Sequence, residues 1–262
     1  MPPVFLEFAS FLTALYQLPG MYQYLKKNAT LKNRYSGKSV YILGNGPSLS
    51  NFDLKRIEKE CVITMNHFEL HPLKDQFKIV AHCVGEPYKS VTWEDPRPMF
   101  EGVKANSYWV NADSRSFFSR ENSYNVHYYL PGLRSNARLL DGSNLTGIAL
   151  RYQSTSQMAI NVALFLGFKK IYLLGFDHDW LVTRGHSPHF YEERDGVEKA
   201  DLSRFSYVEM IRISLSLFEI YEKLAFVAKK RGALIVNLSR PSYLDVFPTE
   251  DASHKHAIYP NQ

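Results

Sequence analysis

Hydrophobic residues recur along the chain in short runs that end in polar or glycine-rich turns. Such runs, rich in β-branched and aromatic residues, predict the buried strands of a parallel sheet. The runs cover residues 39–43, 61–65, 77–81, 107–110, 169–177 and 233–238. Two longer segments, 155–167 and 205–231, carry apolar residues at helical spacing and end at or just before a glycine. The chain is therefore predicted to be an α/β protein with a Rossmann-like, doubly wound and mostly parallel sheet.

The segments between these elements suggest how the chain is divided. We expect an apolar and basic helical segment over 1–36, one Rossmann-like domain over 37–247 and a polar tail over 248–262. Within the domain, residues 113–144 show little periodicity and predict an irregular insert or small subdomain. Residues 179–203 form a charged segment that is long for a plain connection, which predicts a lid or binding loop.

Composition narrows the class of protein. At 262 residues the chain can bury a large core without disulfide support. Its two cysteines can form neither a disulfide framework nor a zinc site, which favours a reducing compartment and predicts a cytoplasmic protein. The net charge of +5 is too small to indicate a nucleic-acid partner.

The N-terminal segment leaves two interpretations open. Residues 4–16 are apolar but too few to span a bilayer, and no basic residue precedes them as in a signal peptide. The basic residues that follow are Lys26, Lys27, Lys32, Arg34 and Lys38. An apolar helix followed by lysines is typical of attachment to an anionic surface, here the inner face of the cytoplasmic membrane. The alternative is a helix that docks on the domain or on a second copy of the chain, so a homo-oligomer also stays open.

Polar residues follow the predicted strands, where ligands of open α/β sheets bind. The first strand is followed by Gly44, Asn45, Gly46, Pro47 and Ser48, and the second by Asn66. The glycine turn matches neither the dinucleotide fingerprint nor the P-loop. Glycines before a helix nevertheless let a phosphate approach backbone N–H groups, so we expect a nucleotide phosphate there.

Two further sites are predicted downstream. Thr155 and Ser156 open a helix and form a second anion cradle, unless they serve only as caps. Asp177 and Asp179 follow the strand that contains Gly175, and two such carboxylates could hold Mg²⁺ on a diphosphate. A role of Asp177 in contacting a ribose or base, with no metal bound, stays open beside it.

The predicted lid contains two histidines, His186 and His189. A loop histidine that titrates near neutral pH can remove the proton of an attacking hydroxyl. Two histidines three positions apart could also be solvated, or could bind a metal, although no third ligand is near in the sequence.

Taken together, these residues resemble the bacterial sialyltransferases of glycosyltransferase family 42. The resemblance rests on 40–49, on Asn66 and on 155–177, and extends to a wider superfamily of flagellin-modifying transferases and a hydroxymethylpterin diphosphokinase. It implies a catalytic domain that binds a CMP-activated sugar acid, usually without metal. By position, Asn45 and Asn66 would hold the nucleotide and its phosphate, and Thr155 and Ser156 the cytidine end or the sugar carboxylate. Gly175 and Asp177 would line the ribose and base.

The chain also departs from that family. No histidine lies near the start of the last long helix, and Asp179 stands where the family has tyrosine. The sequence His189-Phe190-Tyr191 looks like the lid motif of the wider superfamily, which implies His189 as general base, His186 as the alternative, and Tyr191 in the donor site.

The function we expect is transfer of a sugar from a nucleotide donor to a hydroxyl of a bacterial surface glycan or lipid-linked acceptor. The donor that the resemblance favours is a CMP-activated sialic-acid-like sugar or Kdo. Two alternatives stay open: a Mg²⁺-dependent diphosphokinase and a non-catalytic nucleotide-binding protein.

Overall fold

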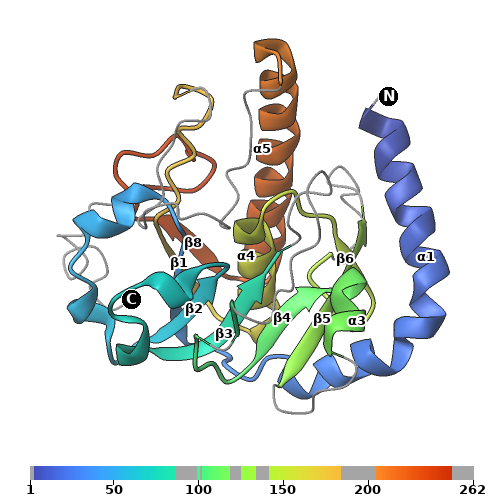
Figure 1. The fold of residues 1–262 in the computed structure, drawn as a ribbon, viewed down its shortest axis with the longest axis horizontal. Helices are drawn as coiled ribbons and strands as arrows, with labels where there is room; N and C mark the ends of the chain where they lie inside the picture. The colour runs from blue at the N-terminus through green and yellow to red at the C-terminus, as the bar shows by residue number, and fades with distance from the viewer. Residues whose placement is uncertain are drawn as a thin grey trace.

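The computed structural model describes residues 3–85, 99–100, 102–118, 125–133, 142–183 and 205–249, with side chains from residue 11 onward. Their strands form one sheet of eight in the order β6-β5-β4-β3-β2-β1-β7-β8, and every neighbouring pair is parallel (Figure 1). The strands are β1 (Ser39–Leu43), β2 (Cys61–Met65), β3 (Lys78–Val84), β4 (Tyr108–Asn111), β5 (Val126–Leu133), β6 (Ile148–Leu150), β7 (Lys170–Leu174) and β8 (Leu234–Asn237). The prediction of a Rossmann-like α/β fold is confirmed.

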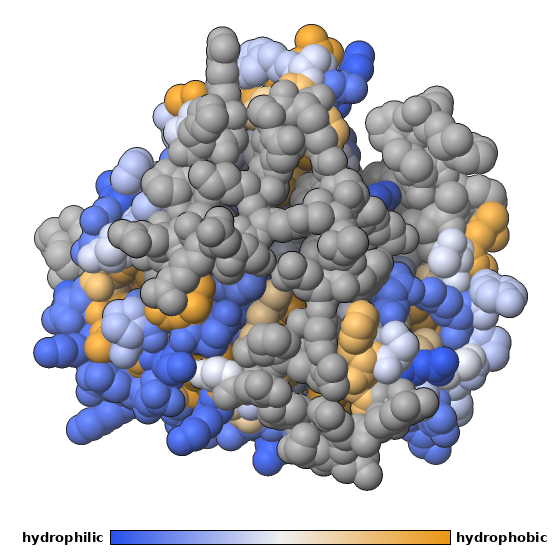
Figure 2. Space-filling view, viewed as in Figure 1, coloured by the Kyte–Doolittle hydropathy of each residue, from blue (hydrophilic) through white to orange (hydrophobic). Residues whose placement is uncertain are grey.

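Helices cover the sheet unequally. The helices are α1 (Pro3–Asn28), α3 (Arg115–Phe118), α4 (Thr155–Leu166) and α5 (Tyr207–Lys230). Helix α4 packs against β1, β2 and β3, and α5 packs against α4 and β8, whereas α1 runs along β5 and β6 (Figure 1). The opposite face of β1 and β2 is covered by short 3-10 helices rather than by long ones. In the space-filling view, apolar residues near the α5 end of the molecule are surrounded by polar surface (Figure 2).

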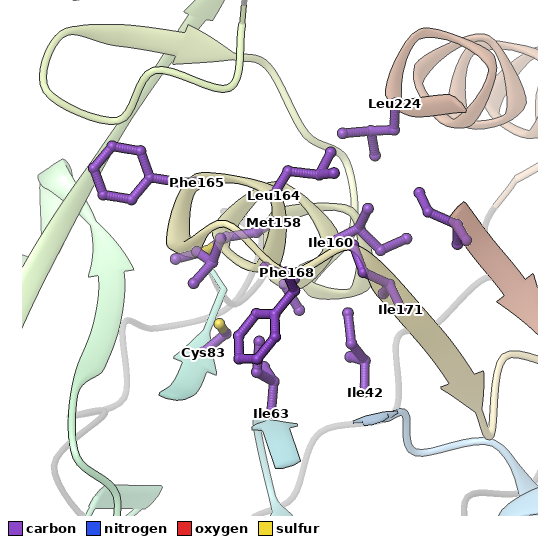
Figure 3. Packing of buried hydrophobic residues seen from close by; sticks show 14 of the residues in the cluster. Ile42, Ile63, Cys83, Met158, Ile160, Leu164, Phe165, Phe168, Ile171 and Leu224 are labelled. Atoms are coloured by element: carbon purple, nitrogen blue, oxygen red, sulfur yellow. The ribbon is translucent and has the colours of Figure 1, made fainter. Parts of the chain in front are cut away.

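Helix α4 lies at the centre of the larger apolar cluster. All but one of its twelve residues are buried, which is typical of a helix that is apolar on all sides. Ile160 lies beside Ile171 of β7, whereas Leu164 points toward Leu224 of α5 (Figure 3). Burying such a side chain stabilises the fold by roughly 1.5 to 3 kcal/mol.

The prediction of an irregular segment over 113–144 is wrong for residues 126–133, because β5 forms there. Pro131 and Gly132 read as a turn in the sequence, yet they lie within the strand. The ladder between β5 and β6 shifts register between Pro131 and Leu133, where a residue without an N–H is tolerated. The parallel pairing with β4 and β6 outweighs the local turn preference.

Helix α1 extends beyond the predicted apolar stretch and docks on the sheet. Its buried side chains Ala14, Met21 and Leu25 pack with residues of β4 and β5. Leu12 and Tyr16 stay exposed. No helix in the described part of the chain is both long and apolar enough to cross a bilayer.

One buried side chain ties the end of α1 to the sheet. The Asn28 amide nitrogen donates to the carbonyl oxygens of Tyr128 (2.8 Å) and Leu145 (2.6 Å). Its oxygen lies 3.0 Å from Nδ1 of His127. Burial lowers the pKa of His127 to about 3, so this ring is neutral at pH 7 and Nδ1 can donate to the amide oxygen.

Replacing this amide should destabilise the protein. Asn28→Ala leaves two carbonyls and one imidazole nitrogen buried without partners, so we expect a loss of about 3 kcal/mol. Urea unfolding would measure the loss. Asn51→Ala, which removes an exposed amide bonded to the Arg240 carbonyl at 3.3 Å, is the control and should change stability by less than about 0.5 kcal/mol. Equal effects of the two substitutions would contradict the anchoring role of Asn28.

Candidate functional site

The site predicted at the ends of the first and later strands lies where the sheet changes direction. Strand β1 pairs with β2 on one side and with β7 on the other, which makes the β1–β7 boundary the topological switch point. The turn after β1 contains Gly44 and Gly46, and the turn after β7 contains Gly175. Backbone bonds join the turns, from Gly44 N–H to the Leu174 carbonyl (2.7 Å) and from Gly46 N–H to the Gly175 carbonyl (3.0 Å). The structure therefore brings these predicted site residues together.

The glycines are required by the close approach of the two turns. A Cβ on Gly44 would lie 2.4 Å from the Gly175 carbonyl oxygen, and one on Gly46 would lie 2.3 Å from Oδ2 of Asp177. Gly175 has φ of +74°, and its Cβ would lie 2.8 Å from the Gly44 carbonyl oxygen. Each turn thus occupies the space in which the other would place a side chain.

Asp177 braces the turn that follows β1. Its Oδ2 accepts the backbone N–H of Ser48 at 2.9 Å, and the side chain is almost fully buried. Burial raises the pKa of this carboxyl above its usual range, and the hydroxyl and then the backbone N–H of Ser48 oppose that rise. One carboxylate oxygen is therefore committed to the protein itself.

The predicted phosphate cradle after β1 has fewer unused donors than the sequence indicates, and a phosphate there stays a prediction. The N–H groups of Gly46 and Ser48 are used inside the protein, and Pro47 has none. The element that follows is a 3-10 helix, Pro47–Asn51, instead of the α-helix whose N-terminus would attract an anion. The contact between the two turns uses the N–H groups of Gly46 and Ser48, which the sequence alone did not show to be occupied.

Three oxygen atoms of the same region have no hydrogen-bond partner among the described residues. They are Oδ1 of Asn45, Oγ of Ser48 and Oδ1 of Asp177, and all three are buried atoms. A buried polar atom without a partner costs about 1 to 3 kcal/mol. A polar ligand at the switch point would supply the missing partners.

The start of α4 keeps its donors. Ser154 is the N-cap, one residue before the predicted caps, and Oε1 of Gln157 accepts the N–H groups of Gln153 (2.8 Å) and Ser154 (3.3 Å). The N–H groups of Thr155 and Ser156 donate to no residue that the structure describes. This twelve-residue helix therefore retains the second of the two predicted anion cradles.

Asn66 and Thr155 meet at the end of β3. Asn66 adopts φ of +46°, its N–H donates to the Cys83 carbonyl (2.9 Å), and its Oδ1 accepts the N–H of Gly85 (3.2 Å). A Cβ on Gly85 would lie 2.1 Å from Oγ1 of Thr155. The structure thus places both predicted residues on the β3 side of the site.

A histidine that the sequence did not single out lies between the two halves of the site. His178 follows Asp177 directly, with φ of +52°. Its Nε2 lies 2.9 Å from the Tyr221 hydroxyl, which lies 2.8 Å from the hydroxyl of Ser156. Burial lowers the pKa of His178 to about 4, so the ring is neutral at pH 7. Nothing in the local sequence distinguishes this residue from a loop histidine.

Of the remaining predicted site residues, the structure describes only Asp179. His186, His189 and Tyr191 lie outside the described residues, as does most of the predicted lid. Asp179 begins a turn, and its backbone carbonyl accepts the N–H groups of Val182 and Thr183. Among the described residues, no group of three or more His, Cys, Asp or Glu side chains could hold a metal ion. Binding of Mg²⁺ by Asp177 and Asp179 stays a prediction.

The hollows that the described residues form lie at the opposite edge of the sheet. One is lined by Asn33, Lys169 and Arg231 at the amino end of β7, and the other lies between α5 and β8. In the first, Arg231 Nη1 donates to the Leu164 carbonyl (3.0 Å), and the Asn33 N–H donates to the Phe165 carbonyl (3.0 Å). These donors satisfy the last turn of α4, which is a structural role.

The comparisons with known proteins identify the fold. No family model matches the chain, and no curated protein matches its sequence. The sialyltransferase CstII from Campylobacter jejuni, solved with CMP, is similar with a TM-score of 0.50 and 17% identity, over 82% of this chain and 85% of that chain. A point variant of that enzyme with CMP gives a TM-score of 0.50 and 17% identity over 81% and 86%. Maf glycosyltransferase from Magnetospirillum magneticum AMB-1 gives 0.46 and 15% over 89% and 39%. At such identities the likeness to CstII establishes a shared fold.

Adding a methyl group at Gly46 should separate the two turns. Because the new Cβ would lie 2.3 Å from the Asp177 carboxylate, we expect Gly46→Ala to lower stability by about 2 to 4 kcal/mol. Chemical denaturation would measure the loss. Gly147→Ala is the control, since its Cβ meets no atom within 4 Å. A Gly46→Ala protein as stable as this control would show that the close approach is not required.

Removing the charge of Asp177 should reveal the cost of burying it. The raised pKa means that the folded protein binds more protons than the unfolded chain once the pH passes the unfolded value of about 3.9. Ionisation therefore destabilises the native state as the pH rises. Asp177→Asn retains an oxygen for the Ser48 N–H, so we expect it to be at least as stable as the wild type at pH 7. Its relative stability should fall as the pH approaches 4.

Thermal unfolding across this pH range would test the expectation. The exposed carboxylate variant Asp75→Asn should show no comparable pH dependence relative to the wild type. A marked loss of stability in Asp177→Asn at pH 7 would mean that the ionised carboxylate stabilises the fold.

Proposed function

We propose that this protein is a glycosyltransferase that uses a CMP-activated sugar donor. The observation that carries the proposal is the set of buried, unpartnered oxygen atoms of Asn45, Ser48 and Asp177 at the switch point. Such atoms fit the hydroxyl and amino groups of a nucleoside, which donate hydrogen bonds. The fold shared with a sialyltransferase solved with CMP supports the choice of nucleotide.

The transferred group that fits best is a sialic-acid-like sugar or Kdo, and the acceptor is a hydroxyl of a bacterial surface glycan or lipid-linked glycan. Cleavage of the bond between sugar and phosphate places negative charge on the departing nucleotide. The N–H groups of Thr155 and Ser156, which no described residue uses, would stabilise that charge. The phosphate therefore belongs at α4 rather than at the turn after β1.

A histidine would take the proton of the attacking hydroxyl. We assign this role to His189, with His186 as the alternative, and place Tyr191 beside the donor. The assignment rests on the sequence motif of the lid.

The reaction we propose needs no divalent metal. Asp177 directs one carboxylate oxygen to the Ser48 N–H, which leaves only its other oxygen for a metal. Asp179 by itself would make a poor site.

A membrane-linked acceptor would suit the N-terminal segment. Lys26 and Lys27 lie in the last turn of α1, and further basic residues follow up to Lys38. Together they would attract the anionic inner face of the cytoplasmic membrane.

Nucleotide binding is the first test of the proposal. We expect CMP to raise the melting temperature of the purified protein, equally with Mg²⁺ and with EDTA. A ligand at 100 times its dissociation constant stabilises the native state by about 2.7 kcal/mol. The same measurement with CDP, UDP, GDP and ATP should give smaller shifts.

The other outcomes point elsewhere. A rise in melting temperature that requires Mg²⁺ together with a nucleoside diphosphate or ATP would contradict the proposal. It would favour Asp177 and Asp179 as metal ligands. A CMP shift without any transfer or hydrolysis of CMP-sugars would leave a nucleotide-binding protein.

A further inference from the structure

A chain of hydrogen bonds crosses the floor of the candidate site. It runs from His178 Nε2 to the Tyr221 hydroxyl (2.9 Å), from there to Oγ of Ser156 (2.8 Å), and on to Oγ of Ser154 (2.7 Å). The chain joins the residue after Asp177 to the first turn of α4. It therefore links the two sides of the site through one side chain of α5.

Tyr221 is held rigidly at the centre of this chain. Its side chain is fully buried and packs in the main apolar cluster. Its ring lies edge-on to the imidazole of His178 with centroids 5.1 Å apart, and Phe218 contacts the same imidazole at 6.1 Å. These contacts, a further ring contact with Phe176 at 6.4 Å and one hydrogen bond fix the orientation of the His178 ring.

The second ring nitrogen of His178, Nδ1, is not used by the hydrogen-bond chain. Nδ1 forms no hydrogen bond with any residue that the structure describes, and the side chain is only partly buried. The left-handed backbone at this position, uncommon for residues other than glycine, turns the side chain back toward α5. Strain of this kind persists where the surrounding structure requires it.

The hydrogen-bond chain permits two directions of donation, and the direction that runs toward His178 fixes what Nδ1 offers. A neutral imidazole carries one proton, and each hydroxyl donates once. If Ser154 donates to Ser156, Ser156 to Tyr221 and Tyr221 to Nε2, the proton of the ring lies on Nδ1. A donor at this position fits an anionic oxygen.

We propose that His178 binds an anionic oxygen of the nucleotide donor through its Nδ1–H, and that Tyr221 is the residue that positions it. The inference rests on the proposed function, since it assigns a further contact within the same site. The ligand chemistry is a phosphate oxygen of the nucleotide, to which His178 adds a side-chain donor from the turn after β7.

Two substitutions at His178 separate the roles of its ring nitrogens. The amide of asparagine occupies the place of Nδ1, whereas that of glutamine reaches the place of Nε2. We expect His178→Gln to weaken CMP binding about tenfold or more, because the group facing the ligand is lost. His178→Asn keeps a donor at the place of Nδ1 and loses only the bond to Tyr221, so we expect CMP affinity to fall by no more than about three- to tenfold. Asparagine also tolerates the left-handed backbone.

The positioning role is tested at Tyr221. Tyr221→Phe keeps the ring and removes the hydroxyl, so we expect CMP affinity to fall about three- to tenfold. The matched control is Tyr129→Phe, which removes an equally buried hydroxyl that donates to the Leu150 carbonyl (2.6 Å) away from the site. The control should lose stability without losing CMP affinity. Calorimetric titration with CMP, with urea unfolding of each variant, measures both.

The outcomes distinguish the two proposals. If the wild type binds CMP and His178→Gln binds it equally, the role of His178 is wrong while the proposed function stands. If His178→Gln does not fold, Tyr221→Phe provides the test, and an unchanged CMP affinity in that variant overturns the inference. If the wild type binds no nucleotide in the panel, the proposed function is wrong and this inference falls with it.

Discussion

The rest of the structure depends on the close backbone contact between the turns that follow β1 and β7. Gly44 and Gly175 meet there so closely that neither could carry a side chain without displacing the other turn. The bond from Ser48 to Asp177 then joins residues that are 129 positions apart in the chain. Because β1 and β7 are also the strands at which the sheet changes direction, this contact defines one wall of the candidate site.

Helix α4 lies on the other side of the site, and its two ends differ in whether their backbone groups have partners within the protein. The carbonyls of its last turn are satisfied by the N–H groups of Asn33 and Tyr35 and by the side chain of Arg231. In its first turn, the N–H groups of Thr155 and Ser156 donate to no residue that the structure describes. Burial of nearly the whole helix holds it in one place on β1, β2 and β3. The open N–H groups therefore have a fixed position relative to the switch point, which preorganised binding of an anion requires.

The central strands could be predicted because each is a compact apolar run between polar turns. The same reasoning failed for β5, where Pro131 and Gly132 carry the local signature of a turn. The ladder with β4 and β6 and the docking of α1 stabilise that strand from outside its own sequence. The three residues of β6 are too few for any periodicity to be recognised. Local patterns thus identify an element when its own residues stabilise it, and miss one that depends on its neighbours.

The candidate site shows the same limit at the scale of single atoms. The positions of Gly46, Asp177 and Thr155 at the carboxyl edge follow from the order of predicted strands and turns. Which N–H groups remain unused follows from contacts between distant segments, such as those that occupy the N–H groups of Gly46 and Ser48. His178 belongs to the second class, because its orientation is determined by Tyr221, 43 residues away. A residue whose role comes from a distant partner leaves no mark in its own stretch of sequence, so only the folded arrangement distinguishes His178 from an ordinary loop histidine.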